Sequence, residues 1–440
     1  MEDAVKRTCM GELAVWKGRS GRKPLILKGA RQTGKTWLVK EFGRQEFTDT
    51  VTIDFMLDES YKSLFIQDLD PRRIIAQIEL REGRRIDPEN TLLFFDEIQE
   101  APRGIASLKY FCEQAYEYHV IAAGSYMGLG LRREGESFPV GKVDTLTLYP
   151  LTFVEFIRAV AGDMLADALE TGDMALLGSV SDMLERRLKE YMVIGGMPEV
   201  VARFAATGDY AECRRLQNDI LQAYDADFSK HAPVRLLERM RMAWRSIPGQ
   251  LAHENKKFIY GAVRPGARAR DFEEALQWLE DYGVVYKVPR VAALRVPLVG
   301  YEDLSAFKLF CCDLGLLGAM AGLSEAAVLD EQRVFTEFKG ALTEQYVLQE
   351  YVAQGERPVY WANDSGSAEI DFALGTPRGI IPVEVKAGEN LRAKSLRVAC
   401  DKFCIDRAVR TSLASYRDDG WLVNVPLWAV LHSKHFALDQ

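Results

Sequence analysis

The first third of the chain alternates between short apolar runs and stretches with helical spacing. The apolar or β-rich runs are PLILK (24–28), VTIDF (51–55), TLLFF (91–95) and HVIAA (119–123). Amphipathic stretches such as TWLVKEF separate them. Strands that are apolar along their whole length lie buried on both faces, as in a parallel sheet covered by helices. The pattern therefore predicts an α/β domain with a parallel sheet over residues 1–150.

The middle of the chain has a different pattern. Residues 151–234 have mostly helical spacing, interrupted by a Gly-Gly-Met-Pro stretch at 195–198 that must form a turn or loop. In residues 235–300, two helical stretches are followed by the β-type runs VVYKV (284–288) and VAALRV (291–296). Two helices followed by a β-hairpin are the outline of a winged helix. We therefore expect a helical lid region and then a winged-helix-like domain.

The last part of the chain, residues 301–440, mixes helix and strand. A long helical segment at 334–352 is followed by strand-like runs at 359–362, 368–374 and 379–386, separated by turn residues. This order predicts a separate C-terminal α/β domain.

The composition is that of an ordinary globular protein, with 48% hydrophobic and 27% charged residues. The net charge of −8 argues against a generic polyanion binder, although a local basic face is compatible with it. The seven cysteines are scattered and odd in number, which favours reduced thiols over a disulfide framework. There is no signal-peptide core and no apolar run of about 18 residues, so we expect a cytoplasmic protein without a membrane span.

A glycine-rich segment connects the first predicted strand to the first predicted helix. Its residues form a complete G-x-x-x-x-G-K-T motif: Gly29, Ala30, Arg31, Gln32, Thr33, Gly34, Lys35 and Thr36. The glycines let backbone N–H groups surround a phosphate, and the helix N-terminus adds partial positive charge. Lys35 is expected to reach the β and γ phosphates of ATP, and the Thr36 hydroxyl to bind Mg²⁺. An accidental glycine-rich turn is the alternative, but the flanking strand and helix argue against it.

Two acidic residues, Asp96 and Glu97, directly follow the run TLLFF. The strand would deliver them to its carboxyl end, beside the glycine-rich segment. Asp96 is expected to hold Mg²⁺ directly or through water, and Glu97 to orient and activate the attacking water as a general base. Acids at a strand end are common, so the prediction depends on their pairing with the glycine-rich segment.

The next predicted strand ends at Gly124-Ser125. The Ser125 hydroxyl could sense the γ-phosphate or position the water, and an ordinary turn residue is the alternative. Arg132, Arg133 and Lys142 follow within a short stretch. One of them could act as an arginine finger, or its lysine substitute, in a neighbouring subunit, which would make the protein a homo-oligomer. A solvated charge cluster is the alternative.

Five segments together resemble a bacterial and archaeal protein family. They are GARQTGKT, LLFFDEIQEAP, AAGSY, LYPLTFVEF and GGMPEVV. The family consists of AAA-type P-loop ATPases with a C-terminal domain of formerly unknown function. The resemblance covers nearly the whole chain and implies an ATPase. Similar proteins usually carry Gly-Arg in the loop before LYPL, whereas this chain has Gly141-Lys142, and lysine offers a point charge instead of a planar fork.

Four charged residues of the C-terminal domain have the order Glu … Asp … Glu-x-Lys, which resembles the PD-(D/E)xK nuclease core of restriction endonucleases. Asp371 and Glu384 could chelate a divalent metal that activates water against a phosphodiester, with Glu344 completing the metal shell. Lys386 lies on the same face of the strand as Glu384 and could stabilise the developing charge. An exposed ion pair is the alternative, but two charges in the apolar run IPVEVK are costly unless used or exposed.

A basic cluster lies in the winged-helix-like part. Arg264, Arg268 and Arg270, with Lys256 and Lys257 nearby, could grip phosphates. The adjoining helix DFEEALQWLEDYG is acidic, which argues against its insertion in a DNA major groove, and a packing role is the alternative.

The sequence as a whole leaves three functions open. They are an ATP-driven machine acting on DNA with a nuclease-like tail, a regulatory ATP switch without cleavage, and a protein remodeller of the AAA type.

Overall fold

The computed structural model describes residues 5–124, 138–253, 256–329, 336–363, 368–388 and 393–438. The chain divides into two units. The first, called the P-loop unit, holds Arg7–Tyr149 and Asp281–Gly283, and the second, called the C-terminal unit, holds Pro150–Glu280 and Val284–Gln440. Nearly all of the chain after Tyr149 thus falls in one compact unit, and the finer division into four domains stays a prediction.

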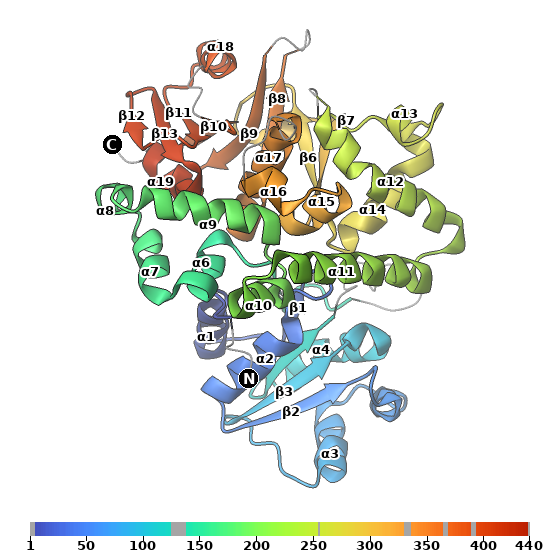
Figure 1. Cartoon of the computed structure of the whole chain (residues 1–440). Coiled ribbons are helices and arrows are strands. Elements are labelled where there is room, and N and C mark those ends of the chain that lie inside the picture. The colour runs from blue at the N-terminus through green and yellow to red at the C-terminus, as the bar shows by residue number, and fades with distance from the viewer. Residues whose placement is uncertain are drawn as a thin grey trace. The chain divides into compact units, whose positions relative to one another are not determined.

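The P-loop unit is built on a sheet of five strands. The strands are β1 (Leu25–Lys28), β2 (Asp49–Asp54), β3 (Thr91–Asp96), β4 (His119–Ala123) and β5 (Asp144–Thr147). Their spatial order is β2-β3-β4-β1-β5, and every neighbouring pair is parallel. Strands β1, β2 and β3 are labelled in Figure 1. The predicted parallel sheet is confirmed. The pattern does not predict β5, because its sequence DTLT alternates between half-buried and exposed positions and has no apolar run.

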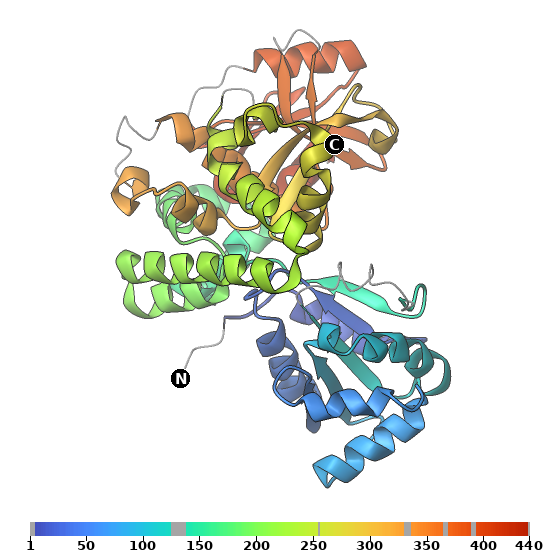
Figure 2. The same ribbon diagram turned by 90° about the vertical axis from the view of Figure 1, so that its right-hand side faces the viewer.

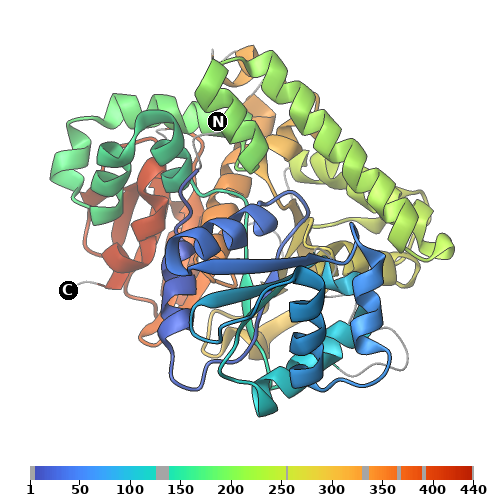
Figure 3. The same cartoon turned by 90° about the horizontal axis from the view of Figure 1, so that it is seen from below.

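Helices cover both faces of this sheet (Figure 3). The helical segments are α1 (Met10–Gly18), α2 (Lys35–Glu46), η1 (Glu59–Phe65), α3 (Pro71–Glu82), η2 (Ile98–Glu100) and α4 (Pro102–Gln114). Leu92 and Phe94 of β3 pack in one core cluster with α1 and α2. Leu93 and Phe95 pack in a second cluster with α3 and α4. This explains why the run TLLFF is apolar at consecutive positions.

The C-terminal unit begins with a helical region, which confirms the predicted helical middle. Its helices are α6 (Phe153–Ala161), α7 (Asp163–Thr171), α8 (Met174–Gly178), α9 (Ser181–Ile194), α10 (Pro198–Thr207), α11 (Tyr210–His231), α12 (Val234–Ala252), α13 (Tyr260–Val263) and α14 (Ala269–Asp281). The 22-residue α11 lies beside α10 (Figure 2). The Gly-Gly-Met-Pro stretch forms the turn between α9 and α10, as its composition predicts.

A mixed sheet of eight strands forms the rest of the C-terminal unit. The strands are β6 (Val285–Val291), β7 (Glu302–Cys311), β8 (Val359–Ala362), β9 (Glu369–Thr376), β10 (Gly379–Val385), β11 (Ala408–Ser412), β12 (Arg417–Asp418) and β13 (Leu422–Pro426). Their order is β12-β13-β11-β10-β9-β8-β6-β7 (Figure 1). The accompanying helical segments are η3 (Leu298–Tyr301), α15 (Leu314–Met320), α16 (Glu325–Leu329), α17 (Thr336–Ala353), α18 (Lys394–Phe403), η5 (Leu427–His432) and α19 (Ser433–Leu438). The predicted long helix and the three strands after it are confirmed.

One strand prediction is wrong. A hairpin does follow α14, but β6 and β7 form it, and VAALRV (291–296) is not its second strand. Val296 is 63% exposed and precedes Pro297, which lacks the backbone N–H that a central strand needs. The hairpin also extends the C-terminal sheet, because β6 pairs with β8 in parallel.

The segments LYPLTFVEF and GGMPEVV owe much of their sequence to packing. The backbone N of Leu151 donates to the Gly196 carbonyl at 2.7 Å, and a Cβ on Gly196 would collide with the Leu151 backbone. The Asp313 carboxylate accepts from the Gly196 backbone N at 2.6 Å, and that of Glu350 accepts from the first amide of α6 at 2.8 Å. Both carboxylates are buried. The two segments therefore tie the helical region to α15 and α17.

Candidate functional site

The glycine-rich segment is a tight turn between the end of β1 and the start of α2. Gly29 and Gly34 have φ values of +147° and +89°, which favour glycine. A Cβ on Gly29 would also collide with the carbonyl oxygen of Leu148. α2 begins at Lys35, and the first backbone N–H groups of a helix have no helical acceptors. The backbone is therefore shaped to surround a phosphate.

The Lys35 side chain is folded over this turn. Its Nζ donates to the carbonyl oxygens of Gly29 at 3.0 Å and Ala30 at 2.8 Å. Burial lowers the pKa of Lys35 to about 8, although the charges of Glu97 and Asp96 act in the opposite direction. Carbonyl oxygens compensate a buried ammonium only in part, so a phosphate would be a stronger partner for Lys35.

Asp96 and Glu97 lie at the carboxyl end of β3, beside Thr36. Thr36 Oγ1 donates to Asp96 Oδ2 at 2.8 Å, and the backbone N of Glu97 donates to Asp96 Oδ1 at 3.0 Å. Burial raises the pKa of Asp96, the Thr36 hydrogen bond lowers it, and the Glu97 charge raises it further, with a net upward shift. Gln99 Nε2 donates to Glu97 Oε2. A hydroxyl in contact with a carboxylate is the pair that holds Mg²⁺ in P-loop sites, so these residues fit the metal.

Arg7 is a residue of this site that the sequence pattern does not reveal. Its Nη1 donates to the Thr33 carbonyl at 3.0 Å, and its Nη2 donates to the Tyr149 carbonyl at 2.7 Å. The guanidinium thus holds the glycine-rich turn against the segment after β5. A Cβ on Gly283 would lie 3.3 Å from the backbone N of Ala30, so a remote turn packs here as well. No local signal predicts these contacts, because the partners lie far apart in the sequence.

The remaining candidates near the γ-phosphate are only partly placed. Ser125, Arg132 and Arg133 lie outside the described residues. Lys142 Nζ lies 2.8 Å from Glu113 Oε1 on α4, and this contact raises the pKa of Lys142. The finger role of any of these residues stays a prediction.

In the C-terminal unit, Glu344 of α17 lies in a buried cluster of charges. Lys256 Nζ pairs with Glu344 Oε1, and Lys308 Nζ lies 3.5 Å from Glu344 Oε2 and 2.6 Å from Glu369 Oε1. Burial raises the pKa of Glu344, but the charges of Lys308 and Lys256 outweigh it and the net shift is downward. Lys256 of the predicted basic cluster therefore has a carboxylate partner inside the protein. Neither Lys308 nor Glu369 belongs to the residue pattern that suggests a metal site in the sequence.

The other three candidates lie on neighbouring strands. Asp371 belongs to β9 and Glu384 to β10, and Lys386 directly follows β10. The backbone N of Val385 donates to Asp371 Oδ2 at 2.8 Å. Burial and the nearby Glu344 charge raise the pKa of Asp371 to about 7. Lys386 Nζ lies 2.7 Å from Glu384 Oε1, whereas the buried Glu384 Oε2 has no hydrogen-bond partner within the described part of the chain. Asp371 is thus within electrostatic reach of Glu344, and Glu384 forms an ion pair with Lys386.

These C-terminal residues fit a divalent metal poorly. Over the described ranges, no group of three or more His, Cys, Asp or Glu side chains could hold a metal ion. Glu344 also faces two ammonium groups, which would repel a divalent cation bound to the same carboxylate. The assignment of Glu344, Asp371 and Glu384 as metal ligands therefore stays a prediction.

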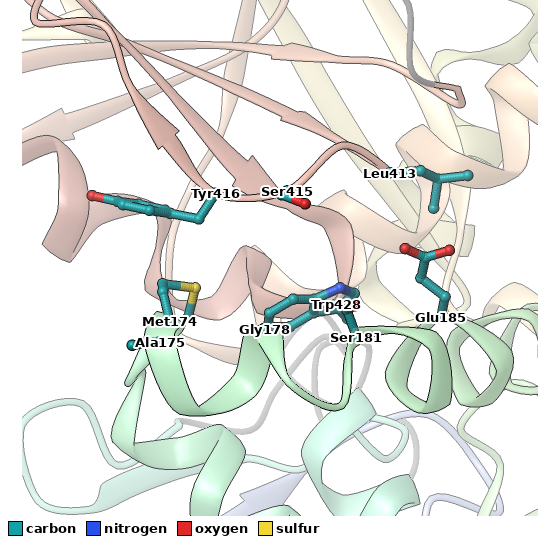
Figure 4. A pocket seen from close by; sticks show the side chains of 9 residues that line it. All are labelled: Met174, Ala175, Gly178, Ser181, Glu185, Leu413, Ser415, Tyr416 and Trp428. Carbon is teal, nitrogen blue, oxygen red and sulfur yellow. The ribbon is translucent and has the colours of Figure 1, made fainter.

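A cavity of about 380 Å³ lies elsewhere in the C-terminal unit (Figure 4). Residues of α8, α9, η5 and the segment after β11 line it: Met174, Ala175, Gly178, Ser181, Glu185, Leu413, Ser415, Tyr416 and Trp428. This lining contains one carboxylate and no basic side chain. It therefore lacks the paired charged groups that acid–base chemistry or phosphate binding would need.

The chain has weak structural similarity to several solved structures. A Walker-type ATPase of Pyrococcus abyssi is 12% identical, with 72% of this chain and 96% of that chain covered and a TM-score of 0.43. The ORC2 protein of Aeropyrum pernix is 12% identical, with 75% and 94% covered and a TM-score of 0.34. Similarity at this level carries no functional argument. No curated protein matches the chain. None of the described helices is long and apolar enough to cross a membrane.

Three family models match parts of the chain. Residues 185–327 match a domain of unknown function, DUF8612, which the five family-like segments do not predict. Residues 339–428 match another domain of unknown function, DUF4143, as the family resemblance implies. Residues 21–157 match the model of an AAA domain. The segment that contains the glycine-rich turn, Asp96 and Glu97 is therefore similar to the ATPase domain of AAA proteins.

Proposed function

We propose that this protein binds ATP with Mg²⁺ at the glycine-rich turn and hydrolyses it. The observation that carries the proposal is the contact between Thr36 Oγ1 and Asp96 Oδ2, beside a lysine whose ammonium group donates to two backbone carbonyl groups. The match of residues 21–157 to an AAA domain supports it. Bound ATP and Mg²⁺ would supply the reactive γ-phosphoryl group and a cation that neutralises its charge.

The residues of the protein have separate tasks in this proposal. The backbone from Gly29 to Thr36 surrounds the phosphates, and the Lys35 ammonium holds the β and γ oxygens. Thr36 and Asp96 hold the metal. Glu97 orients a water molecule and accepts its proton. Gln99 donates to Glu97 and fixes that carboxylate at the end of β3.

Turnover by the wild type, Lys35→Ala and Lys40→Ala tests this proposal. Both lysines belong to α2, but Lys40 is exposed and therefore serves as the matched control. Loss of the Lys35 ammonium should lower the rate by roughly 10²-fold or more and weaken nucleotide binding, because phosphate charge is left uncompensated. Lys40→Ala should leave both unchanged. Undiminished turnover in Lys35→Ala would refute the proposal.

The proposal extends to neighbouring copies of the chain. Ser125 would contact the γ-phosphate from its own subunit, and Arg132 or Arg133 would reach the site of a neighbour. ATP should then promote self-association into a homo-oligomer, which light scattering with a slowly hydrolysed analogue would detect. A monomer in every nucleotide state would contradict this part of the proposal.

Two functions compete for the C-terminal unit. It is either a nuclease that acts on DNA, or a catalytically silent domain in a regulatory ATP switch or protein remodeller. The contacts of Lys256 and Lys308 with Glu344 favour the silent domain, because they leave a metal poorly accommodated. Incubation of the protein with plasmid and Mg²⁺ or Mn²⁺, with and without ATP, separates the two. Cleavage that vanishes in Asp371→Ala and Lys386→Ala would establish the nuclease.

A further inference from the structure

Lys308 is a charged residue whose side chain has no exposed surface. It belongs to β7, and its side chain is 0% exposed. Its Nζ lies 2.6 Å from Glu369 Oε1, 3.5 Å from Glu344 Oε2 and 5.0 Å from the ring centre of Tyr360. An ammonium group is costly to bury unless carboxylates surround it. Lys308 and the acid cluster therefore depend on each other.

A second ammonium group approaches the same carboxylate from another part of the chain. Lys256 lies between α12 and α13 and pairs with Glu344 Oε1, while Lys308 faces Glu344 Oε2. Glu344 is only 4% exposed. Both of its oxygens are thus engaged by cations of the protein, and solvent hardly reaches them.

We propose that Lys308 and Lys256 occupy the place that a divalent cation takes in metal-dependent nuclease cores. Two ammonium groups carry the same total charge as one Mg²⁺, so the protein itself balances the charges of Glu344 and Glu369 beside Asp371. A metal bound to Glu344 would lie within a few ångströms of both lysines and would be repelled. The C-terminal unit is therefore folded without a metal and does not cut phosphodiesters by metal-activated water. This inference does not depend on the ATPase proposal.

Mn²⁺ binding to the nucleotide-free full-length protein tests the inference directly. Electron paramagnetic resonance measures the free ion, and the Asp96→Asn background removes the contribution of the P-loop unit. We expect no bound Mn²⁺ in this background, and the same melting temperature in EDTA and in millimolar Mn²⁺. An ion that is bound in Asp96→Asn and lost when Glu344→Gln is added would overturn the inference.

A second experiment replaces the internal cation by an external one. Lys308→Met should lower the melting temperature by about 5 °C or more, because buried carboxylates lose their partner, and Mn²⁺ should restore part of the loss. Lys287→Met is the matched control, since Lys287 lies on the adjacent strand β6 and is exposed. It should show neither effect.

Two outcomes of this second experiment would contradict the inference. A folded Lys308→Met protein with an unchanged melting temperature contradicts the inference. So does a lowered melting temperature that Mn²⁺ does not raise. If Lys308→Met does not fold, the Mn²⁺ titration of the Asp96→Asn protein decides the question.

Discussion

In the described part of the chain, two buried sites made of acids and lysines differ in how the acids are held. In the P-loop unit, Asp96 accepts hydrogen bonds from a threonine hydroxyl and a backbone amide, which are neutral donors. In the C-terminal unit, Glu344 contacts the ammonium groups of Lys256 and Lys308. A neutral donor can remain in place, or become a ligand itself, when a cation arrives. An ammonium group must move away.

Burial does not explain this difference, because Asp96 and Glu344 are each 4% exposed. Their pKa values nevertheless shift in opposite directions. That of Asp96 is raised by burial, whereas that of Glu344 is lowered because the lysine charges outweigh burial. Two carboxylates with the same exposed fraction thus differ in the groups that an arriving cation would meet. The partners of a buried carboxylate therefore matter. Neutral donors leave its negative charge available to a cation, whereas ammonium groups already compensate that charge.

The largest expected contrast is between Glu97→Gln and Glu384→Gln. Glu97→Gln should lower ATP hydrolysis by roughly 10²-fold or more and retain ATP binding, because the amide cannot accept a proton from water. Glu384→Gln, the same change at an acid of the C-terminal unit, should leave ATP turnover unchanged. Steady-state rates and nucleotide titrations measure both quantities. Wild-type turnover in Glu97→Gln would show that another group activates the water.

A smaller contrast is expected in the requirement for Mg²⁺. Asp96→Asn should raise the Mg²⁺ concentration that half-saturates ATP hydrolysis by about 10- to 100-fold, the scale of losing a group that holds or orients a metal ligand. Asp371→Asn should not change it, because the C-terminal cluster does not share that ion. Mg²⁺ titrations at saturating ATP measure the shift. Equal Mg²⁺ requirements in the wild type, Asp96→Asn and Asp371→Asn would show that Asp96 does not hold the metal.

The site in the P-loop unit is largely predictable because its chemistry is local. Consecutive residues from Gly29 to Thr36 form one tight turn, so their spacing alone carries the geometry that phosphate binding would need. Asp96 meets Thr36 because the strands before them are parallel and end at the same edge of the sheet. The run TLLFF predicts that buried strand correctly. Arg7 escapes prediction because its contacts are made with backbone carbonyls, which any residue could offer.

The C-terminal site is less predictable because its residues come from separate segments. The order of Glu344, Asp371 and Glu384 suggests a metal site, but the sequence does not say what faces each carboxylate. Lys308 had a signal, since it lies in the apolar run AFKLFCC and a charge in such a run requires a partner. The partner itself, Glu344 on a distant helix, follows only from the tertiary structure.

Arg7→Ala should have a moderate effect that is confined to nucleotide affinity. Without the guanidinium, the glycine-rich turn loses the hydrogen bond between Arg7 and the Thr33 carbonyl, so the KM for ATP should rise roughly 3- to 10-fold while kcat changes little. Arg22→Ala is the matched control, because Arg22 also donates to a backbone carbonyl, that of Lys17, away from the turn. It should leave KM unchanged. A lower kcat with an unchanged KM in Arg7→Ala would mean that Arg7 acts on the chemical step instead.

The smallest expected effect is on the pH dependence of stability, and it separates two buried acids of one helix, Glu344 and Glu350 on α17. Among the described residues, no lysine pairs with Glu350: its carboxylate accepts from the first amide of α6, and burial raises its pKa to about 8. The folded protein therefore keeps this proton at pH values where the unfolded chain has lost it. Its contribution to stability is complete below the usual pKa of about 4.5 and is lost as the pH rises to about 8. The contribution of Glu344 changes with pH in the opposite direction. Because its pKa is lowered, this contribution is present above about pH 4.5 and is lost in more acidic solution.

Thermal unfolding of the wild type, Glu350→Gln and Glu344→Gln at about pH 4, 5.5 and 8 tests these two opposite pH dependences of stability. Glu350→Gln should lose less stability than the wild type between pH 5.5 and 8, by roughly 1–3 kcal/mol, because glutamine can accept the same hydrogen bond and does not ionise. Glu344→Gln should lose its part of the acid-side dependence, with a lower melting temperature at neutral pH. Asp313 and Asp371 also have raised pKa values, to about 6 and about 7, but they are unchanged in these variants and cancel in the comparison. Parallel pH profiles for the wild type and Glu350→Gln would mean that Glu350 is ionised at neutral pH, and that a buried carboxylate on this helix needs no lysine partner to carry its charge.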